Sequence, residues 1–324
     1  MKDLSLNGKS VVVTGGYGFI PSHLVDGLIL EKPSRLIVLD NFSQSGAHNL
    51  DEAKKNFGKL KIFKCDIAEQ KELRAIIHKG SVDVIFHLAT LSLNESLIRP
   101  KKVIETILSM AINLLELQRK GGFKTLIMMS SSEAYGSAKF APMSEDHPLM
   151  PNTPYAAAKA SADLLAFSYC KTFGNDVSIV RSFNNYGPRQ NARLGGVVTS
   201  TIEALLLGRT PVLLGRGDQS RDFLFVGDTV RGILDIYKKP ATREQVINLG
   251  SGKKTKIKDL IKMLIEISGK QTNHLIKAGR KSDVSEHLAD ISTARKLLNW
   301  SPQTNLRNGL LTTYNWYKEN YYSH

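Results

Sequence analysis

The stretch KSVVVTGGYGFIPSH, from Lys9 to His23, decides the fold of this chain. A run rich in valine leads into a glycine-rich turn, and a helical pattern begins at about Phe19. Glycines after a strand let the backbone turn tightly and approach a pyrophosphate, whose charge is favoured at the N-terminus of the following helix. The stretch therefore predicts a buried strand, a phosphate-binding turn at Gly15 and Gly18, and a helix.

The same order of elements continues along the chain. Short apolar runs alternate with longer amphipathic segments, and the runs are RLIVLD, KIFKCD, VDVIFHLA, KTLIMMSS and DVSIVRS. Such alternation is typical of a parallel sheet covered by helices on both faces. We therefore expect an α/β fold with a Rossmann-type, doubly wound parallel sheet, followed by a smaller C-terminal lobe.

The alternation of strands and helices ends in the second half, where the sequence predicts loops and then mainly helices. One more strand-like piece, QVINLGSG, is expected to return to the first sheet. We expect the two parts to pack closely, with a cleft at the carboxyl ends of the strands. The predicted boundaries are 1–182 for the dinucleotide-binding domain, with 222–252 partly returning to it, and 183–221 with 253–324 for the substrate-binding lobe.

Composition narrows the possible partners. The 324 residues include 44 Lys and Arg against 30 Asp and Glu, a net charge of +14. Such an excess suits an anionic partner, whether nucleic acid, membrane or a phosphate-bearing small molecule. The lysines are scattered, however, and no zinc-finger, RNA-recognition or basic-zipper pattern is present. We therefore expect no nucleic-acid partner.

The cysteines and the N-terminus indicate the compartment. Cys65 and Cys170 lie in apolar segments rather than at framework or metal-ligand spacing, which predicts buried thiols, a reducing compartment and no metal site. The N-terminus lacks an apolar targeting segment, and no run approaches the ~18 apolar residues needed to span a bilayer. We expect a soluble, cytoplasmic protein without a membrane partner.

Acidic residues at two strand ends indicate the cofactor. Asp40 ends RLIVLD, where it can accept hydrogen bonds from an adenosine ribose, and its charge repels a 2′-phosphate, so NAD is favoured over NADP. Asp66, after the third strand, is expected to face the adenine amine. Pro21 stands where a third glycine is usual, and because it lacks an N–H we expect it to alter the packing of the first helical turn.

Tyr155 and Lys159, in PYAAAK, lie four residues apart and therefore on one side of a helix. A nearby ammonium and a positive nicotinamide ring favour phenolate, which would let Tyr155 take a proton from a sugar hydroxyl near neutral pH. A tyrosine and lysine at this spacing are common on helix surfaces, so the pair needs support from the rest of the chain.

That support is a set of motifs whose order resembles the extended short-chain dehydrogenase/reductase family of NAD-dependent nucleotide-sugar epimerases and dehydratases. The resemblance covers nearly the whole chain and implies NAD, a nucleotide-sugar substrate, and a homodimer or higher homo-oligomer formed through helices near 103–119 and 155–172. The motifs are TGGYGFI, Asp40, HLA at 87–89, Ser131 ahead of Tyr155 and Lys159, FNNYGPRQ, and GRGDQSRDF.

The resemblance also implies residue roles. Ser131, Tyr155 and Lys159 look like the catalytic triad, with Ser131 bonded to the sugar O4 and Lys159 also holding the nicotinamide ribose. The implied cofactor-binding residues are Gly15, Tyr17, Gly18, Phe19, Ile20, Asp40, Asn41, Asp66, Ile67, Leu88, Ala89, Tyr155 and Lys159. Arginines suit a diphosphate by charge and fork geometry, and the implied substrate-binding residues are Thr90, Asn184, Val198, Arg221, Arg280 and Asp283.

Three positions besides Pro21 depart from the family pattern. Ile107 replaces an asparagine and Met110 a glycine in the helix ILSMAINLLE, which changes packing beneath the site. Thr90 follows HLA where alanine is commoner, so it is expected near the cofactor or the sugar.

The loop SSSEAYG, from Ser130 to Gly136, bears on the reaction. All members of this group begin with oxidation at C4, after which a 4-epimerase only returns hydride to the other face. A dehydratase also needs a base for the C5 proton, which the C4 ketone makes acidic. A glutamate at the position of Glu133 is what 4,6-dehydratases show and 4-epimerases usually lack, although an exposed loop carboxylate without a chemical role is the alternative.

The serine–glutamate pair Ser132 and Glu133 resembles that of GDP-mannose 4,6-dehydratases, UDP-glucuronate decarboxylases and 4-keto-sugar reductases. We expect a nucleotide-sugar dehydratase with tightly held NAD, in which Glu133 is the C5 base and Ser132 assists. The expected substrate is a UDP-hexose, for example UDP-N-acetylglucosamine, and the product a 4-keto-6-deoxy sugar or a 5,6-ene. The alternatives are a UDP-sugar 4-epimerase, a UDP-glucuronate decarboxylase, a non-catalytic nucleotide sensor and a nucleic-acid-binding protein.

Overall fold

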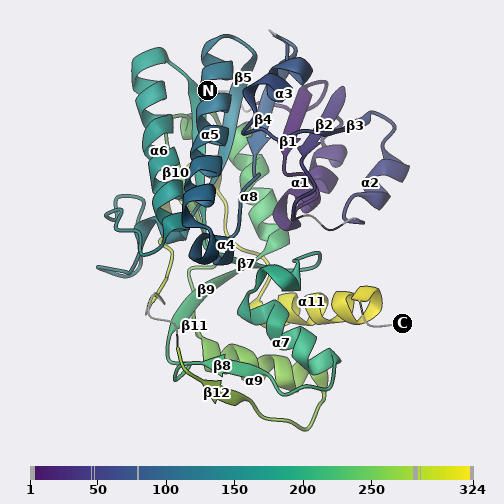
Figure 1. Cartoon of the computed structure of the whole chain (residues 1–324), viewed down its shortest axis with the longest axis vertical. Coiled ribbons are helices and arrows are strands. Elements are labelled where there is room, and N and C mark those ends of the chain that lie inside the picture. Colours follow the sequence, from purple (N-terminus) through teal and green to yellow (C-terminus); the bar gives the residue numbers. More distant parts are fainter. Residues whose placement is uncertain are drawn as a thin grey trace.

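The computed structural model describes residues 4–44, 46, 48–78, 80–279, 284 and 286–321. They form a large sheet with helices on both faces and a smaller lobe below it, where the C-terminal helix also lies (Figure 1). In this part of the chain no helix is long and apolar enough to cross a membrane.

A seven-stranded sheet forms the larger part, with strand order β10-β6-β5-β4-β1-β2-β3 and every neighbouring pair parallel. The order reverses between β1 and β4, which is where open α/β sheets bind ligands. The predicted doubly wound fold is confirmed. The strands are β1 (Ser10–Thr14), β2 (Arg35–Asp40), β3 (Leu60–Lys64), β4 (Val82–His87), β5 (Phe123–Ser131), β6 (Asp176–Ser182) and β10 (Val246–Leu249).

Strand register brings the candidate residues to one edge. Thr14 on β1 lies opposite Leu39 on β2 and His87 on β4. The residues that follow these three strands therefore meet at the carboxyl edge of the sheet.

Two hydrophobic cores, one on each face, hold the helices to the sheet. On α5, Val103, Ile107, Ala111 and Leu114 recur at helical spacing and are buried in the core of one face, and each large apolar side chain contributes about 1.5–3 kcal/mol. That face carries α3 (Gln70–Ile76), α5 (Pro100–Arg119), which α4 (Leu93–Ile98) precedes, and α6 (Pro154–Phe173); the other carries α1 (Phe19–Leu30), α2 (Asp51–Asn56), α8 (Val226–Lys238) and α10 (Ser292–Leu298) (Figure 1).

The start of α6 is closely determined by its sequence. The Thr153 side chain accepts a hydrogen bond from the Ala156 N–H at 3.2 Å, and Pro154 occupies the first helical turn, where its missing N–H costs nothing. Gly174, in the left-handed region at φ 70°, ends the helix. Tyr155 is thereby held in the first turn, at the edge of the sheet.

The smaller lobe has its own core, formed by three helices and two small sheets. The helices are α7 (Val197–Leu206), α9 (Ile257–Ser268) and α11 (Leu306–Tyr321). One sheet contains β7 (Asn184–Tyr186), β9 (Ser220–Phe225) and β11 (Lys254–Lys256), and the other β8 (Val212–Leu214) and β12 (Leu275–Lys277).

The C-terminal half returns to the large sheet more than once. Helix α8 joins one of its cores and β10 pairs with β6. A later stretch also returns, because Ala294 and Leu298 of α10 and Trp300 are buried in the same core. The expected boundaries placed that stretch in the lobe; its apolar face was not distinguishable by pattern from the face of a lobe helix.

Candidate active site

A cavity of about 330 Å³, called the first cavity here, opens at the carboxyl edge of the sheet around the switch point between β1 and β4. All but one of the expected cofactor-binding residues line it, and so do Thr90 and Ser131. Those residues are Gly15, Gly18, Phe19, Ile20, Asp40, Asn41, Asp66, Ile67, Leu88, Ala89, Tyr155 and Lys159.

The turn after β1 depends on glycine. Gly15 has φ 68°, and a Cβ built on it would lie 2.8 Å from the Ala89 Cα, a distance that side chains do not show. The Thr14 hydroxyl oxygen accepts hydrogen bonds from the Leu88 and Ala89 N–H groups at 3.1 and 3.2 Å, which holds β1 and β4 together at this point. Gly15 therefore lets the turn pack directly on Ala89, and its backbone, which lines the first cavity, is rigidly placed.

His87 adds a further hydrogen bond to the Thr14 hydroxyl. Burial, with the charge of Lys159 adding, lowers the pKa of His87 to about 3, so the ring is neutral. The Thr14 oxygen already accepts two N–H bonds, so its hydroxyl hydrogen is left to donate to Nδ1 of His87, the two atoms being 2.9 Å apart.

Pro21 leaves α1 uninterrupted. It is the third residue of the helix, and N–H groups of the first turn have no intrahelical acceptor, so proline removes no helical hydrogen bond there. Its ring instead packs closely on Gly18, where an added Cβ would lie 3.1 Å from the proline Cγ.

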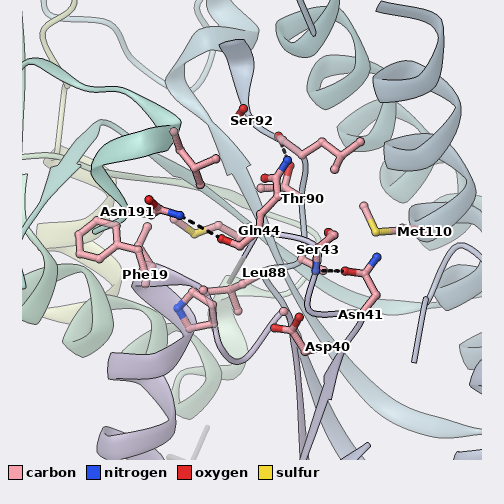
Figure 2. A pocket seen from close by; sticks show the side chains of 18 of the residues that line it. Phe19, Asp40, Asn41, Ser43, Gln44, Leu88, Thr90, Ser92, Met110 and Asn191 are labelled. Carbon is pink, nitrogen blue, oxygen red and sulfur yellow. Dashed lines mark hydrogen bonds between the residues drawn. The ribbon is translucent and has the colours of Figure 1, made fainter. Parts of the chain in front are cut away.

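Asp40 is buried at the end of β2 and faces the first cavity (Figure 2). One carboxylate oxygen accepts from the Tyr17 N–H at 2.9 Å and the other from the Phe42 N–H at 2.7 Å. The Tyr17 ring is buried against the Phe42 ring, with centroids 5.0 Å apart, and Tyr17 is the one expected cofactor residue outside the cavity wall. Tyr17 therefore acts on the cofactor site through its backbone N–H, which holds Asp40 in place.

The region around Asp66 contains a residue that the sequence argument missed. Asp66 accepts from the Asn41 side-chain amide at 3.0 Å. Asn113, on α5, donates to the carbonyls of Ile67 and Ala68 at 3.0 and 2.7 Å and so fixes the loop beside Asp66. An asparagine among mainly apolar residues of α5 was the available signal, since a buried amide needs partners.

Ile107 and Met110, which depart from the family pattern in α5, lie in different surroundings. Ile107 is buried in the core against the sheet, so an apolar side chain is well accommodated there. Met110 is also buried but lines the first cavity, beyond Asn41 (Figure 2).

Ser131, Tyr155 and Lys159 meet at one end of the first cavity. Lys159 donates to the Met129 carbonyl at 3.0 Å, and its Nζ lies 5.9 Å from the centroid of the Tyr155 ring. Burial raises the pKa of Tyr155 to about 12 and the charge of Glu133 adds to this, whereas hydrogen bonding with Ser131 and Thr90 opposes it. Burial lowers the pKa of Lys159 to about 8, against the charge of Asp163. The protein alone thus favours the neutral phenol.

A buried ion pair lies behind this group. Asp163 accepts from Arg181 Nε at 2.8 Å and from the Ser130 hydroxyl at 2.9 Å. The Arg181 guanidinium also lies 4.6 Å from the centroid of the Tyr135 ring. The pair joins α6 to β6 directly behind the catalytic residues.

Ser132 and Glu133 lie on a one-turn 3-10 helix, Ser132–Tyr135, that begins where β5 ends. The Ser131 hydroxyl caps it by accepting from the Glu133 N–H at 3.2 Å. Ser132 is buried, with its hydroxyl oxygen 3.5 Å from Nδ1 of His287, and Glu133 Oε1 is 4.0 Å from the same nitrogen. Neither Ser132 nor Glu133 is among the described residues that line the first cavity.

A second cavity, of about 360 Å³, lies in the lobe. It contains Asn184 and Arg221 and shares Leu194 and Gly195 with the first cavity. Val198 lies elsewhere, buried in the lobe core beside the cavity residues Val197 and Ser200. Arg280 and Asp283 lie outside the described residues.

The loop 187–196 follows the boundary between the two cavities and contributes residues to both. Its contacts come from four separate segments. The Tyr317 hydroxyl of α11 donates to the Gln190 carbonyl. The other contacts come from α1, the loop after β2, and α4. They are His23 Nε2 to the Pro188 carbonyl at 2.9 Å, Arg189 to Asp26 at 2.6 Å, Asn191 to the Gln44 carbonyl at 3.4 Å (Figure 2), and Asn94 to the Leu194 carbonyl at 2.7 Å.

The first cavity fits a dinucleotide. Gly15 and Gly18 of the glycine turn line it, and Asp40 and Asp66 provide carboxylates where a ribose and an adenine amine would bind. A search of the described residues finds no group of three His, Cys, Asp or Glu side chains that could hold a metal ion.

Comparisons with known proteins agree with this site. The family model described as GDP-mannose 4,6 dehydratase matches residues 12–313. A UDP-glucuronate 4-epimerase of Thermodesulfobacterium geofontis is 33% identical over 317 residues, covering 95% of this chain and 96% of the relative. The structure of a UDP-glucose 4-epimerase of Thermotoga maritima is 32% identical with a TM-score of 0.89, covering 96% and 99% of the two chains. That of a dTDP-glucose 4,6-dehydratase of Streptomyces venezuelae, with NAD bound, is 31% identical with a TM-score of 0.90, covering 96% and 97%.

Other similar proteins are named as UDP-glucuronic acid decarboxylases, so proteins like this one carry the names of three different reactions. The family model spans most of the chain, and the relatives align over nearly all of it. The chain therefore belongs to the GDP-mannose 4,6-dehydratase family of extended short-chain dehydrogenase/reductases, the NAD-dependent nucleotide-sugar epimerases, dehydratases and decarboxylases, as its motifs predicted.

Proposed function

We propose that this protein is a nucleotide-sugar 4,6-dehydratase that uses NAD and acts on a UDP-hexose. The observation that carries the proposal is the position of Glu133, whose charge acts on the Tyr155 hydroxyl from the turn next to Ser131. A carboxylate beside the catalytic phenol is what removal of a second proton, from C5, requires.

Oxidation at C4 is the first step. Bound NAD supplies the hydride acceptor for C4 and a positive ring beside Tyr155 that favours the phenolate. Tyr155 takes the proton of the C4 hydroxyl, and Ser131, which hydrogen-bonds with Tyr155, orients the same oxygen. The Lys159 ammonium, 5.9 Å from the ring centroid, adds favourable charge.

Glu133 carries the second step. The C4 ketone makes the C5 proton acidic, and the Glu133 carboxylate takes it. The electron pair of the C5–H bond forms a C5–C6 double bond while the C6 hydroxyl leaves, and the proton held by Glu133 departs with it as water. Return of hydride to C6, with a proton from solvent added at C5, gives a 4-keto-6-deoxy sugar. Return of hydride to C4, with the proton of Tyr155 added at O4, gives a 5,6-ene.

The second cavity holds the nucleotide in this proposal. Arg221 provides positive charge for the diphosphate and Asn184 a side-chain amide, and the shared residues Leu194 and Gly195 lie where the sugar passes toward Tyr155. UDP is favoured because UDP-sugars are named for most of the similar epimerases and decarboxylases.

A UDP-sugar 4-epimerase is the second candidate. The relatives named as epimerases favour it, and so does the absence of Glu133 from the described lining of the first cavity. An epimerase uses the same Tyr155, Ser131 and Lys159 and has no use for a C5 base.

The deciding experiment incubates the protein with UDP-, dTDP-, GDP- and CDP-hexoses in D₂O and identifies the products by mass spectrometry and NMR. Loss of water is expected, with deuterium at C5 marking the keto product. A product of unchanged mass without carbon-bound deuterium would assign the protein as an epimerase. Glu133→Gln should stop water loss and leave C4 oxidation, whereas the exposed Glu105→Gln on α5 serves as the matched control.

A further inference from the structure

His287 is a fully buried histidine that the reaction scheme above does not use. It lies between β12 and α10, where the chain leaves the lobe and returns to the large sheet. Its backbone N–H donates to the Ser220 carbonyl at 3.2 Å, so it lies beside Arg221 of the second cavity. The Phe183 ring packs edge-on against it, with centroids 6.1 Å apart.

One hydrogen bond determines which ring nitrogen carries the proton. Nε2 lies 2.8 Å from the Gly136 carbonyl, which can only accept, so Nε2 is the donor. Nδ1 of the neutral ring therefore presents a lone pair. It lies 3.5 Å from the Ser132 hydroxyl oxygen and 4.0 Å from Glu133 Oε1.

A lone pair facing a carboxylate is unfavourable unless a proton lies between them. Burial lowers the pKa of His287 to about 4, with Arg221 and His147 adding to the effect, so that proton is not held by the histidine near neutral pH. The charge of Glu133 also acts on Tyr155, whose hydroxyl is neutral without the cofactor. A proton that Glu133 takes from a substrate can therefore be shared with Nδ1 of His287.

We propose that His287 is a positioning residue that accepts a hydrogen bond from the protonated form of Glu133, with Ser132 beside it, and so strengthens Glu133 as the base for C5. The inference rests on the dehydratase proposal. Glu133 takes the C5 proton, points it at Nδ1 of His287 while the C5–C6 double bond forms, and releases it to the departing C6 hydroxyl. The 4.0 Å separation shortens when the proton is present, as catalytic hydrogen bonds do when the reacting complex forms.

Two substitutions separate this role from a structural one. His287→Gln places a donor near Nε2, toward the Gly136 carbonyl, and removes the acceptor at Nδ1. His287→Asn places an amide oxygen near Nδ1 and gives up the Gly136 bond. If His287 only supports the fold, the asparagine variant should be the more damaged; if it assists Glu133, the glutamine variant should be.

The experiment measures, for wild type and both variants, C5 deuterium exchange and water loss against pH, the reduced-nicotinamide absorbance that reports C4 oxidation, and thermal unfolding. We expect His287→Gln to slow C5 exchange about tenfold or more, to move its acid limb to lower pH because protonated Glu133 loses its acceptor, and to keep C4 oxidation. His287→Asn should retain more of the exchange.

The outcomes separate the two proposals. Water loss by wild type with unchanged exchange in His287→Gln would overturn the role of His287 and leave the dehydratase standing. Greater loss in His287→Asn, with a matching fall in thermal stability, would make the residue structural and overturn the proposal as well. An epimerised product from wild type, with no C5 exchange, would remove both.

Discussion

The two buried cations Arg181 and Lys159 differ in their hydrogen-bond partners. Arg181 donates to the carboxylate of Asp163 at 2.8 Å, whereas Lys159 donates to the neutral Met129 carbonyl at 3.0 Å and has no carboxylate within ion-pair distance among the residues that the structure describes. The first charge is neutralised where it is buried. The second is left to act on Tyr155 and on a ligand, so the difference separates a charge that holds the fold from one kept for chemistry.

The sharpest test of the chemical side is Tyr155→Phe. Removing the hydroxyl removes the group that takes the C4 proton, and we expect C4 oxidation to fall about a thousandfold. The ring remains, so the free energy of unfolding should change little. Single-turnover formation of reduced nicotinamide measures the first effect and chemical denaturation the second; retained oxidation would place the base elsewhere.

The structural side is tested by Asp163→Asn, which leaves Arg181 buried without a matching charge. We expect the free energy of unfolding to fall by about 3 kcal/mol, because breaking one partner of a buried pair exposes the full desolvation cost of the other. Denaturant unfolding checks this. The double variant Asp163→Leu with Arg181→Met is the control and should recover most of the loss, whereas equal damage in the double variant would mean that packing dominates.

Lys159→Met should raise the free energy of unfolding, whereas Asp163→Asn lowers it. The pKa of Lys159 falls from 10.5 to about 8, so between these values the unfolded chain holds a proton that the folded chain has released, and stability rises with pH. Below pH 8 the buried ammonium costs about 3 kcal/mol. We expect Lys159→Met to raise the free energy of unfolding of the nucleotide-free protein at pH 7 by about 2 kcal/mol and to flatten the rise toward pH 10. Denaturation at both pH values measures this, and a destabilised variant would contradict the comparison.

The smallest effect is expected from Asp40→Asn, at the far end of the first cavity. Removing the carboxylate removes its repulsion of a 2′-phosphate, and the affinity ratio of NADP to NAD should rise about tenfold. Fluorescence titration with both nucleotides measures the ratio. Asp66→Asn, which changes a carboxylate of the same cavity farther along the sheet edge, should leave the ratio unchanged.

The cofactor half of the molecule was predictable because its residues follow strand ends. Gly15, Asp40 and Leu88 lie at the ends of buried strands, and Asp66 follows the edge strand β3; parallel strands bring such positions to one edge whatever the details of packing. Tyr155 and Lys159 were related by the helical period alone.

Residues whose surroundings come from distant parts of the chain were not predictable in the same way. Val198 differs from the cavity residue Val197 by one position on α7, and that step turns it into the lobe core. Ser132 was expected to assist at the substrate, but the structure turns it toward His287, 155 positions along the chain. No local pattern encodes such a meeting.

The loop 187–196 bears on how readily a bound NAD can exchange. Its contacts with His23, Asp26, Gln44 and Asn94 join α1, the loop after β2 and α4 to a loop that lines the first cavity. We expect these contacts to slow the exchange of a bound dinucleotide with the surrounding pool. In a reaction that ends with the nicotinamide in its starting oxidation state, we expect NAD to act as a resident prosthetic group and the rate to be independent of the cell's ratio of NAD to NADH.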